Sequence, residues 1–138
     1  MDGVASILVV DDNPKFLSDA LPMYGYDVTV AKDGLEALKI LMNKTFDIIL
    51  LDVMMPNMNG WDAARKIRSM KRTDAGTIPI IAMSANAFSE DIINSRISGM
   101  NQHLTKPLEE AKILAELKEC LSRQESGPGS AGSDQKKG

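Results

Sequence analysis

Short apolar runs rich in isoleucine, valine and leucine alternate with longer segments of helical period along the chain. Three of these runs are apolar almost without interruption, as expected for strands that are buried on both faces of a parallel sheet. The predicted strands, of which the fifth has the weakest pattern, are Ile7–Val10, Val28–Val30, Ile48–Leu51, Ile80–Met83 and Met100–Thr105.

The segments between the strands carry apolar residues three and four positions apart, which is the spacing of amphipathic helices. A short first helix is predicted to begin at Pro14, capped by Asp12 and Asn13, and to end near Pro22. The alternation of strand and helix predicts a doubly wound α/β fold with five parallel strands flanked by helices. The longer helices are predicted at Gly34–Asn43, Gly60–Met70, Ala87–Ser98 and Glu109–Leu121.

The C-terminal segment differs in composition from the rest of the chain. After Arg123 it is rich in glycine, serine and charged residues and has little to bury, which is typical of a flexible linker. A length of 138 residues has room for one domain. We therefore expect an N-terminal extension at 1–5, one domain at 6–123, and a flexible linker or tail at 124–138.

Polar residues follow the predicted strands at the edge where an open parallel sheet binds its ligands. Asp11 and Asp12 end the first strand, Asp52 the third and Ser84 the fourth, while the fifth runs into Lys106. Clustered carboxylates repel one another unless a cation lies among them, and oxygen ligands suit Mg²⁺. A Mg²⁺ site is therefore predicted, with Lys106 opposite it. Asp52 is placed to attack phosphorus and form an aspartyl phosphate, and Ser84 to donate a hydrogen bond to a phosphoryl oxygen.

Charge and cysteine content narrow the picture further. The formal charge is −3 and no basic stripe is present, so we expect a protein partner and no direct contact with nucleic acid. The chain has one cysteine, and no signal peptide or stretch of about 20 apolar residues is recognisable. We therefore expect a cytoplasmic domain that makes no contact with a membrane.

Five motifs in register resemble those of the receiver (response regulator) family of two-component signalling, and the resemblance runs from about Ser6 to Arg123. The sequence around Ser84–Phe88 and Gly99–Asn101 is most similar to the receivers of hybrid histidine kinases. The five motifs are Val9-Val10-Asp11-Asp12-Asn13, Leu51-Asp52-Val53-Met54-Met55-Pro56, Asn59-Gly60, Met83-Ser84-Ala85 and Leu104-Thr105-Lys106-Pro107.

The resemblance implies a flavodoxin-like strand order of 2-1-3-4-5 and a role for each site residue. It implies that Asp11, Asp12, Asp52 and the backbone carbonyl of Met54 bind Mg²⁺. Asp52 accepts a phosphoryl group from a phosphohistidine, Ser84 and Lys106 contact that group, and the Lys106–Pro107 peptide is cis.

The implied partners are a histidine kinase or histidine phosphotransfer protein and a downstream effector protein. The domain is expected to be a monomer or weak dimer that serves as a phosphoacceptor, not as an enzyme acting on external substrates, and it fits excision from a hybrid kinase.

One position departs from the family pattern. Three residues before Lys106, where members usually carry tyrosine or phenylalanine, the chain has His103. With Ser84, this residue is expected to form the switch that reports phosphorylation. If the ring turned inward on activation, burial would favour its neutral form and lower its pKa.

Three other functions compete with this hypothesis. A phosphatase of the haloacid dehalogenase type needs an acid two residues after the nucleophile, where this chain has Met54. A flavodoxin-like FMN carrier needs a phosphate loop after the first strand, where Asp11 and Asp12 would repel phosphate. A receiver-like interaction module without phosphorylation stays open as the alternative, because of His103. Met54, Met55 and Met58 are interpreted as packing residues, since no histidine or cysteine accompanies them.

Overall fold

Five parallel strands form one sheet in the order β2-β1-β3-β4-β5, which confirms the doubly wound α/β fold and the expected strand order. The computed structural model describes residues 5–55, 58–85 and 89–126, with side chains described as far as Arg123. The strands are β1 (Ser6–Val10), β2 (Asp27–Ala31), β3 (Ile48–Asp52), β4 (Ile80–Ser84) and β5 (Gln102–Thr105).

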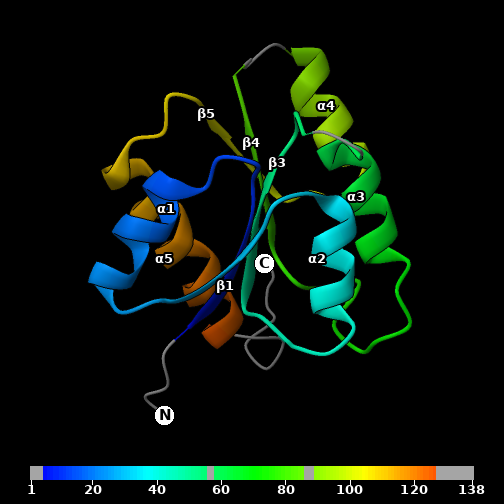
Figure 1. Cartoon of the computed structure of the whole chain (residues 1–138), viewed down its shortest axis with the longest axis horizontal. Helices are drawn as coiled ribbons and strands as arrows, with labels where there is room; N and C mark the ends of the chain where they lie inside the picture. The colour runs from blue at the N-terminus through cyan, green and yellow to red at the C-terminus, as the bar shows by residue number, and fades with distance from the viewer. Residues whose placement is uncertain (1–4, 56–57, 86–88, 127–138) are drawn as a thin grey trace.

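The helices lie on both faces of the sheet (Figure 1). α1 and α5 cover one face, α2 and α3 cover the other, and α4 packs beside β5. A short 3₁₀ helix, η1 (Leu21–Tyr24), continues the first helix. The helices are α1 (Lys15–Ala20), α2 (Gly34–Leu41), α3 (Gly60–Arg68), α4 (Ser89–Ile97) and α5 (Glu110–Ser126).

Alternate residues of the central strands supply two separate cores. In β3, Ile49 and Leu51 belong to the cluster beneath α2 and α3, whereas Ile48 and Leu50 belong to the cluster beneath α1 and α5. All four are fully buried. Because successive side chains of a strand point to opposite faces, a strand covered on both sides must be apolar throughout. The uninterrupted apolar runs in the sequence therefore reflect real two-sided burial.

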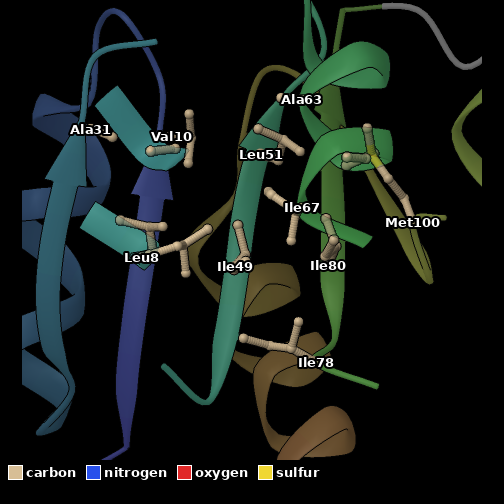
Figure 2. Close-up of a cluster of buried hydrophobic side chains, with 14 of the residues drawn as sticks. Leu8, Val10, Ala31, Ile49, Leu51, Ala63, Ile67, Ile78, Ile80 and Met100 are labelled. Atoms are coloured by element: carbon tan, nitrogen blue, oxygen red, sulfur yellow. The ribbon is translucent and has the colours of Figure 1, made fainter. Parts of the chain in front are cut away.

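The core beneath α2 and α3 is built from strand residues that meet small helix residues. Figure 2 shows Leu8, Ile49 and Ile80 from three adjacent strands lying beside Ala63 and Ile67 of α3. Alanines in α3 let the helix approach the sheet closely, and each fully buried leucine or isoleucine contributes about 1.5–3 kcal/mol relative to an exposed one. The second core contains Cys120, which is buried as expected for a helix residue facing the sheet.

The start of α1 differs from the prediction. Helix α1 begins at Lys15, Pro14 is its N-cap residue, and no side chain caps it. The expected Asx cap is absent because the helix begins one residue later and Pro14, which has no capping side chain, holds the N-cap position. The local bond is made one residue earlier, where Asp11 Oδ1 accepts the backbone N–H of Asn13 at 2.9 Å. The helix is short, as Pro22 indicated, although η1 extends it by one turn.

Four helices also end at residues other than the predicted ones, and one of them, α4, ends at Ile97, one residue before its predicted end. Helix α2 ends at Leu41 and α3 at Arg68, each two residues before the predicted end. Helix α5 continues to Ser126, three residues into the predicted tail. Residues 1–4 and 127–138, which make up most of the expected extension and tail, lie outside the described residues, as do 86–88, which include the predicted start of α4.

Gly60 lets α3 begin directly against the end of β3. Its backbone N–H donates to the carbonyl of Val53 at 2.8 Å. A Cβ atom at this position would lie 2.3 Å from the backbone oxygen of Asp52 and 2.8 Å from the Cα of Val53. These are backbone atoms, so a side chain at position 60 would have to displace the segment that carries Asp52.

We expect Gly60→Ala to lower the free energy of unfolding by about 1–3 kcal/mol, as overpacking does in close-packed sites. The matched control is Gly76→Ala, because a Cβ atom there meets nothing within 4 Å; its effect should stay within about 1 kcal/mol. Urea unfolding measures both. Equal midpoints for the two variants would contradict the assigned contact.

Candidate functional site

The strands place the predicted polar residues at one edge of the sheet. Asp11 follows β1 and donates its backbone N–H to the carbonyl of Ala31 at 3.0 Å, which extends the pairing with β2 by one residue. Its side chain is buried, whereas Asp12, one position further, is exposed. The two carboxylates therefore approach the site from different depths.

Asp52 ends β3 in the middle of the sheet and is 1% exposed. Its two carboxylate oxygens have different partners. Oδ2 accepts a hydrogen bond from Lys106 Nζ at 3.0 Å, and Oδ1 accepts the backbone N–H of Met54 at 3.1 Å. A buried carboxylate needs such a cation and donors to remain ionised.

Lys106 reaches Asp52 from the far side of the site. It follows β5, its backbone N–H donates to the carbonyl of Ser84 at 2.7 Å, and its side chain is 34% exposed. The Lys106–Pro107 peptide bond is cis. The ammonium group thus contacts the buried carboxylate while it stays partly open to solvent.

The carboxylate of Asp52 is one of three that converge at this site. Each of Asp11, Asp12 and Asp52 offers an oxygen that lies within 4.8 Å of those of the other two. Burial is the main cause that raises the pKa of Asp11 to about 6; the N–H of Asn13 opposes this shift, and the negative charge of Asp52 adds to it. Lys106 offsets part of this charge, but the cluster keeps an excess of negative charge. The donor set fits a hard cation that prefers oxygen ligands.

Ser84 and His103 form a second part of the site. Ser84 ends β4 and is buried, and its Oγ lies 2.9 Å from Nε2 of His103, which is half-buried on β5. Burial lowers the pKa of His103, and the negative charge of Asp91 opposes this shift. The two expected switch residues are therefore in direct contact.

The structure adds two supporting contacts around α3 that the sequence did not indicate. Trp61 packs against the core and also donates its Nε1–H to Oγ of Ser95 in α4 at 3.0 Å. Arg68 donates to the carbonyl of Gly99 at 2.9 and 2.7 Å and to the carbonyl of Ala75 at 3.0 Å. No local pattern marks these contacts: Ser95 lies 34 residues from Trp61, and Arg68 lies 31 residues from Gly99 and 7 from Ala75.

The methionines after Asp52 lie as loop and packing residues. Met54 is 72% exposed, whereas Met55 and Met58 pack against the core beneath α2 and α3. The N–H of Met54 bonds to Asp52, so the chain turns back over the carboxylate at this point. The Met54 carbonyl stays a predicted ligand only.

Together, the fold and the site define a class: a doubly wound α/β domain with a cluster of carboxylates, which could hold a metal ion, at the carboxyl edge of its sheet. The model of the response regulator receiver domain family matches residues 7–118. The chain belongs to this family of two-component signalling domains.

The chain is similar to receivers from sensor kinases and from free regulators. It is 40% identical over 119 residues to the sensor histidine kinase RcsC of Salmonella typhi. The aligned region covers 84% of this chain and 12% of the kinase. It is 34% identical over 125 residues to the DNA-binding response regulator MtrA of Mycolicibacterium smegmatis, covering 88% of this chain and 53% of the regulator. The chain thus spans only a part of these relatives.

Solved structures agree with this assignment. The receiver domain of the sensor histidine kinase PA1611 of Pseudomonas aeruginosa, described with a magnesium ion coordinated in its active site cleft, superposes with a TM-score of 0.80. It is 33% identical, and the match covers 88% of this chain and all of that domain. The chemotaxis protein CheY4 of Vibrio cholerae has a TM-score of 0.81 at 29% identity, covering 86% of this chain and 99% of that protein.

The raised pKa of Asp11 predicts a pH-dependent loss of stability in metal-free buffer. Its folded pKa of about 6 lies above the reference value of 3.8, so the stability that its protonation contributes is present below about pH 4 and is lost as the pH rises through 6. Asp11→Asn should therefore unfold with a free energy about 1–3 kcal/mol higher than the parent at pH 7.5.

Chemical denaturation at several pH values in the presence of a chelator measures this difference. The gain from Asp11→Asn should shrink toward pH 4. Asp19→Asn is the control, because Asp19 is exposed and pairs with Lys15 at the surface, where such pairs contribute about 0–1 kcal/mol. An advantage of Asp11→Asn that is the same at pH 4 and pH 7.5 would contradict the assignment.

Proposed function

We propose that this domain accepts a phosphoryl group on Asp52 from a phosphohistidine and changes its partner surface in response. The observation that carries the proposal is the setting of the Asp52 carboxylate. It is buried at the centre of the sheet edge, Lys106 contacts it at 3.0 Å, and two further carboxylates lie beside it. The match to the receiver family supports this role.

The residues around Asp52 provide what phosphoryl transfer needs. A carboxylate oxygen of Asp52 attacks phosphorus while the bond from phosphorus to the donor's histidine nitrogen breaks, and that nitrogen keeps the electron pair. Lys106 neutralises charge on the phosphoryl oxygens, and Ser84 donates a hydrogen bond to one of them. Phosphoryl transfer depends mainly on positioning and charge neutralisation. Lys106 already contacts Asp52, and Ser84 ends β4, the strand that pairs with β3.

Mg²⁺ is the proposed cofactor. The ligands would be carboxylate oxygens of Asp11, Asp12 and Asp52 and the backbone carbonyl of Met54. When bound, the ion would neutralise phosphoryl oxygens and the excess negative charge of the cluster. The relative from Pseudomonas aeruginosa, whose description gives a magnesium ion in its active site cleft, supports this choice.

The domain is proposed to be a phosphoacceptor that assists its own phosphorylation and dephosphorylation, and not a phosphatase for external substrates. Such a phosphatase needs a general acid two residues after the nucleophile. Met54 holds that position here, and its side chain is 72% exposed.

The proposed partners are a histidine kinase or a histidine phosphotransfer protein as donor, and an effector protein as receiver of the signal. Similarity to sensor kinases supports a place within a hybrid kinase, with the domain at 6–123 on the cytoplasmic side. No helix among the described residues is both long and apolar enough to cross a bilayer.

Asp52 should be the sole phosphorylation site. After incubation with acetyl phosphate and Mg²⁺, intact-mass spectrometry should show one added phosphoryl group on the parent and none on Asp52→Asn. Asp62→Asn is the matched control, because Asp62 is an exposed carboxylate on α3 that pairs with Arg65. Labelling of Asp52→Asn at the parent's rate would remove the proposal, because the acceptor would then be another residue. A parent that takes up no phosphoryl group would favour a module that signals without phosphorylation.

Mg²⁺ should bind with a dissociation constant of roughly millimolar order, since a few carboxylates at an open edge hold this reluctantly dehydrated ion loosely. Asp12→Ala should weaken binding at least about tenfold, which corresponds to the loss of about 1.4 kcal/mol. Glu119→Ala is the control, because Glu119 pairs with Arg123 on α5. Titration calorimetry that finds equal affinity for the parent and Asp12→Ala would refute the ligand assignment.

A further inference from the structure

The hydrogen bond between Ser84 and His103 joins the hydroxyl that is proposed to contact the phosphoryl group to a titratable ring. Ser84 Oγ and His103 Nε2 are 2.9 Å apart. The strands set this contact, because β4 and β5 pair in parallel with Ala82 opposite His103 and Ser84 opposite Thr105. The hydroxyl that is proposed to reach the phosphoryl group therefore already has a partner in His103.

The direction of this bond depends on the protonation of the ring. A neutral imidazole with its hydrogen on Nδ1 leaves Nε2 as an acceptor, so Ser84 donates its hydroxyl hydrogen to His103. A doubly protonated ring is a donor at both nitrogens, so Nε2–H then donates to Ser84 Oγ. In that case the hydroxyl hydrogen is released to another acceptor. Protonation of one ring thus decides where the Ser84 hydrogen points.

The surroundings of His103 suit a ring that is neutral before phosphorylation and protonated after it. Burial favours the neutral form, while Asp91 on α4 favours the charged form. A cavity of about 300 Å³ lies on the α5 side of the ring, and one carboxylate oxygen of Glu116 is buried without a partner among the described residues. The charged residues that line this cavity with His103 are Glu109, Lys112 and Glu116.

Two carboxylates and one ammonium group line the cavity, and Lys112 pairs with Glu109 at 3.4 Å. Lys106, three residues along the chain, is directed to Asp52 instead. A proton that reaches His103 would find Asp91 and the acidic lining of the cavity as neighbours.

Building on the proposed function, we propose that His103 is a positioning residue that holds the Ser84 hydroxyl hydrogen while neutral and releases it to the phosphoryl group when protonated. The proton balance is simple: the ring takes one proton from solvent onto Nε2, and the Ser84 hydrogen stays on its oxygen while it turns to the phosphoryl oxygen. His103 gains an N–H bond at Nε2, and no covalent bond of Ser84 breaks or forms.

Phosphorylation and protonation of His103 therefore favour each other. Coupling of two binding events is reciprocal, so a phosphoryl analogue should raise the pKa of His103, and a protonated ring should tighten analogue binding by the same factor. This sign is opposite to the fall in pKa that inward rotation of the ring would cause. The observed contact with Ser84 needs no such rotation.

The resting tautomer provides the first test, and it does not depend on phosphorylation. His103 is the one histidine in the sequence, so its ring signals need no assignment. Long-range proton–nitrogen NMR spectra above the ring's pKa should show the Nδ1–H tautomer in the parent. An Nε2–H tautomer would overturn the proposal, because Ser84 would then be an acceptor before activation.

The second test measures the pKa of His103 with and without beryllofluoride and Mg²⁺. In the parent and in Ser84→Thr, which keeps the hydroxyl, the proton affinity of the ring should rise about fivefold or more, the lower end of ordinary coupling between sites. In Ser84→Ala this rise should be lost. An equal rise in Ser84→Ala would show that charge acts on the ring directly and would overturn the role of the hydroxyl.

The outcomes separate this proposal from the proposed function. If beryllofluoride leaves the amide signals of Asp52 and Ser84 unchanged in the parent, the phosphoacceptor function fails. If those signals shift while the pKa of His103 does not rise, the positioning role alone fails. Should Ser84→Ala not bind beryllofluoride, His103→Gln decides, because its analogue affinity should lose the pH dependence that the parent shows near the ring's pKa; a retained dependence would overturn the proposal.

Discussion

The functional site depends on the burial of carboxylates in a protein interior that disfavours charged groups. Asp11 and Asp52 are almost fully buried at the ends of strands that are mainly apolar. Burial favours the neutral form of a carboxylate, and the raised pKa of Asp11 shows this cost. The two apolar cores must supply the free energy that keeps these groups in place, with Lys106 as the cation that contacts Asp52 directly.

The surrounding backbone converts this charge cluster into a defined geometry. Gly60 brings α3 against the carbonyl of Asp52, and the caps at Asp33 and Asn59 start α2 and α3 by accepting the N–H groups of Glu36 and Asp62. Parallel pairing then brings the ends of β1, β3, β4 and β5 to one edge. The chemistry therefore depends as much on close backbone approach as on the reacting side chains.

The sequence predicts the fold and the composition of the site well, because both follow from strand patterns. Uninterrupted apolar runs indicated two-sided burial, and the polar residue after each run indicated the edge at which Asp11, Asp52 and Lys106 meet. The predictions of the helix ends and of the α1 cap were wrong, because local hydrogen bonds compete at these positions. One such bond joins the N–H of Asn13 to the carboxylate of Asp11.

The bond between Ser84 and His103 was not predictable in the same way. The sequence predicts a shared switch role for the two residues, but their contact depends on side-chain rotamers and on the register of β4 with β5, which no local pattern encodes. The hydrogen bonds from the Arg68 guanidinium to the carbonyls of Gly99 and Ala75 were not predictable either, because they also depend on a side-chain rotamer.

The sheet also separates the two cores, since the side chains beneath α1 and α5 form a cluster distinct from those beneath α2 and α3. Mutations that share no partners have additive effects on stability. A substitution in one core should therefore rarely require compensation in the other, so each core can drift in evolution at its own pace. Covariation between positions should be dense within a core and sparse across the sheet, even for residues that are neighbours in the same strand.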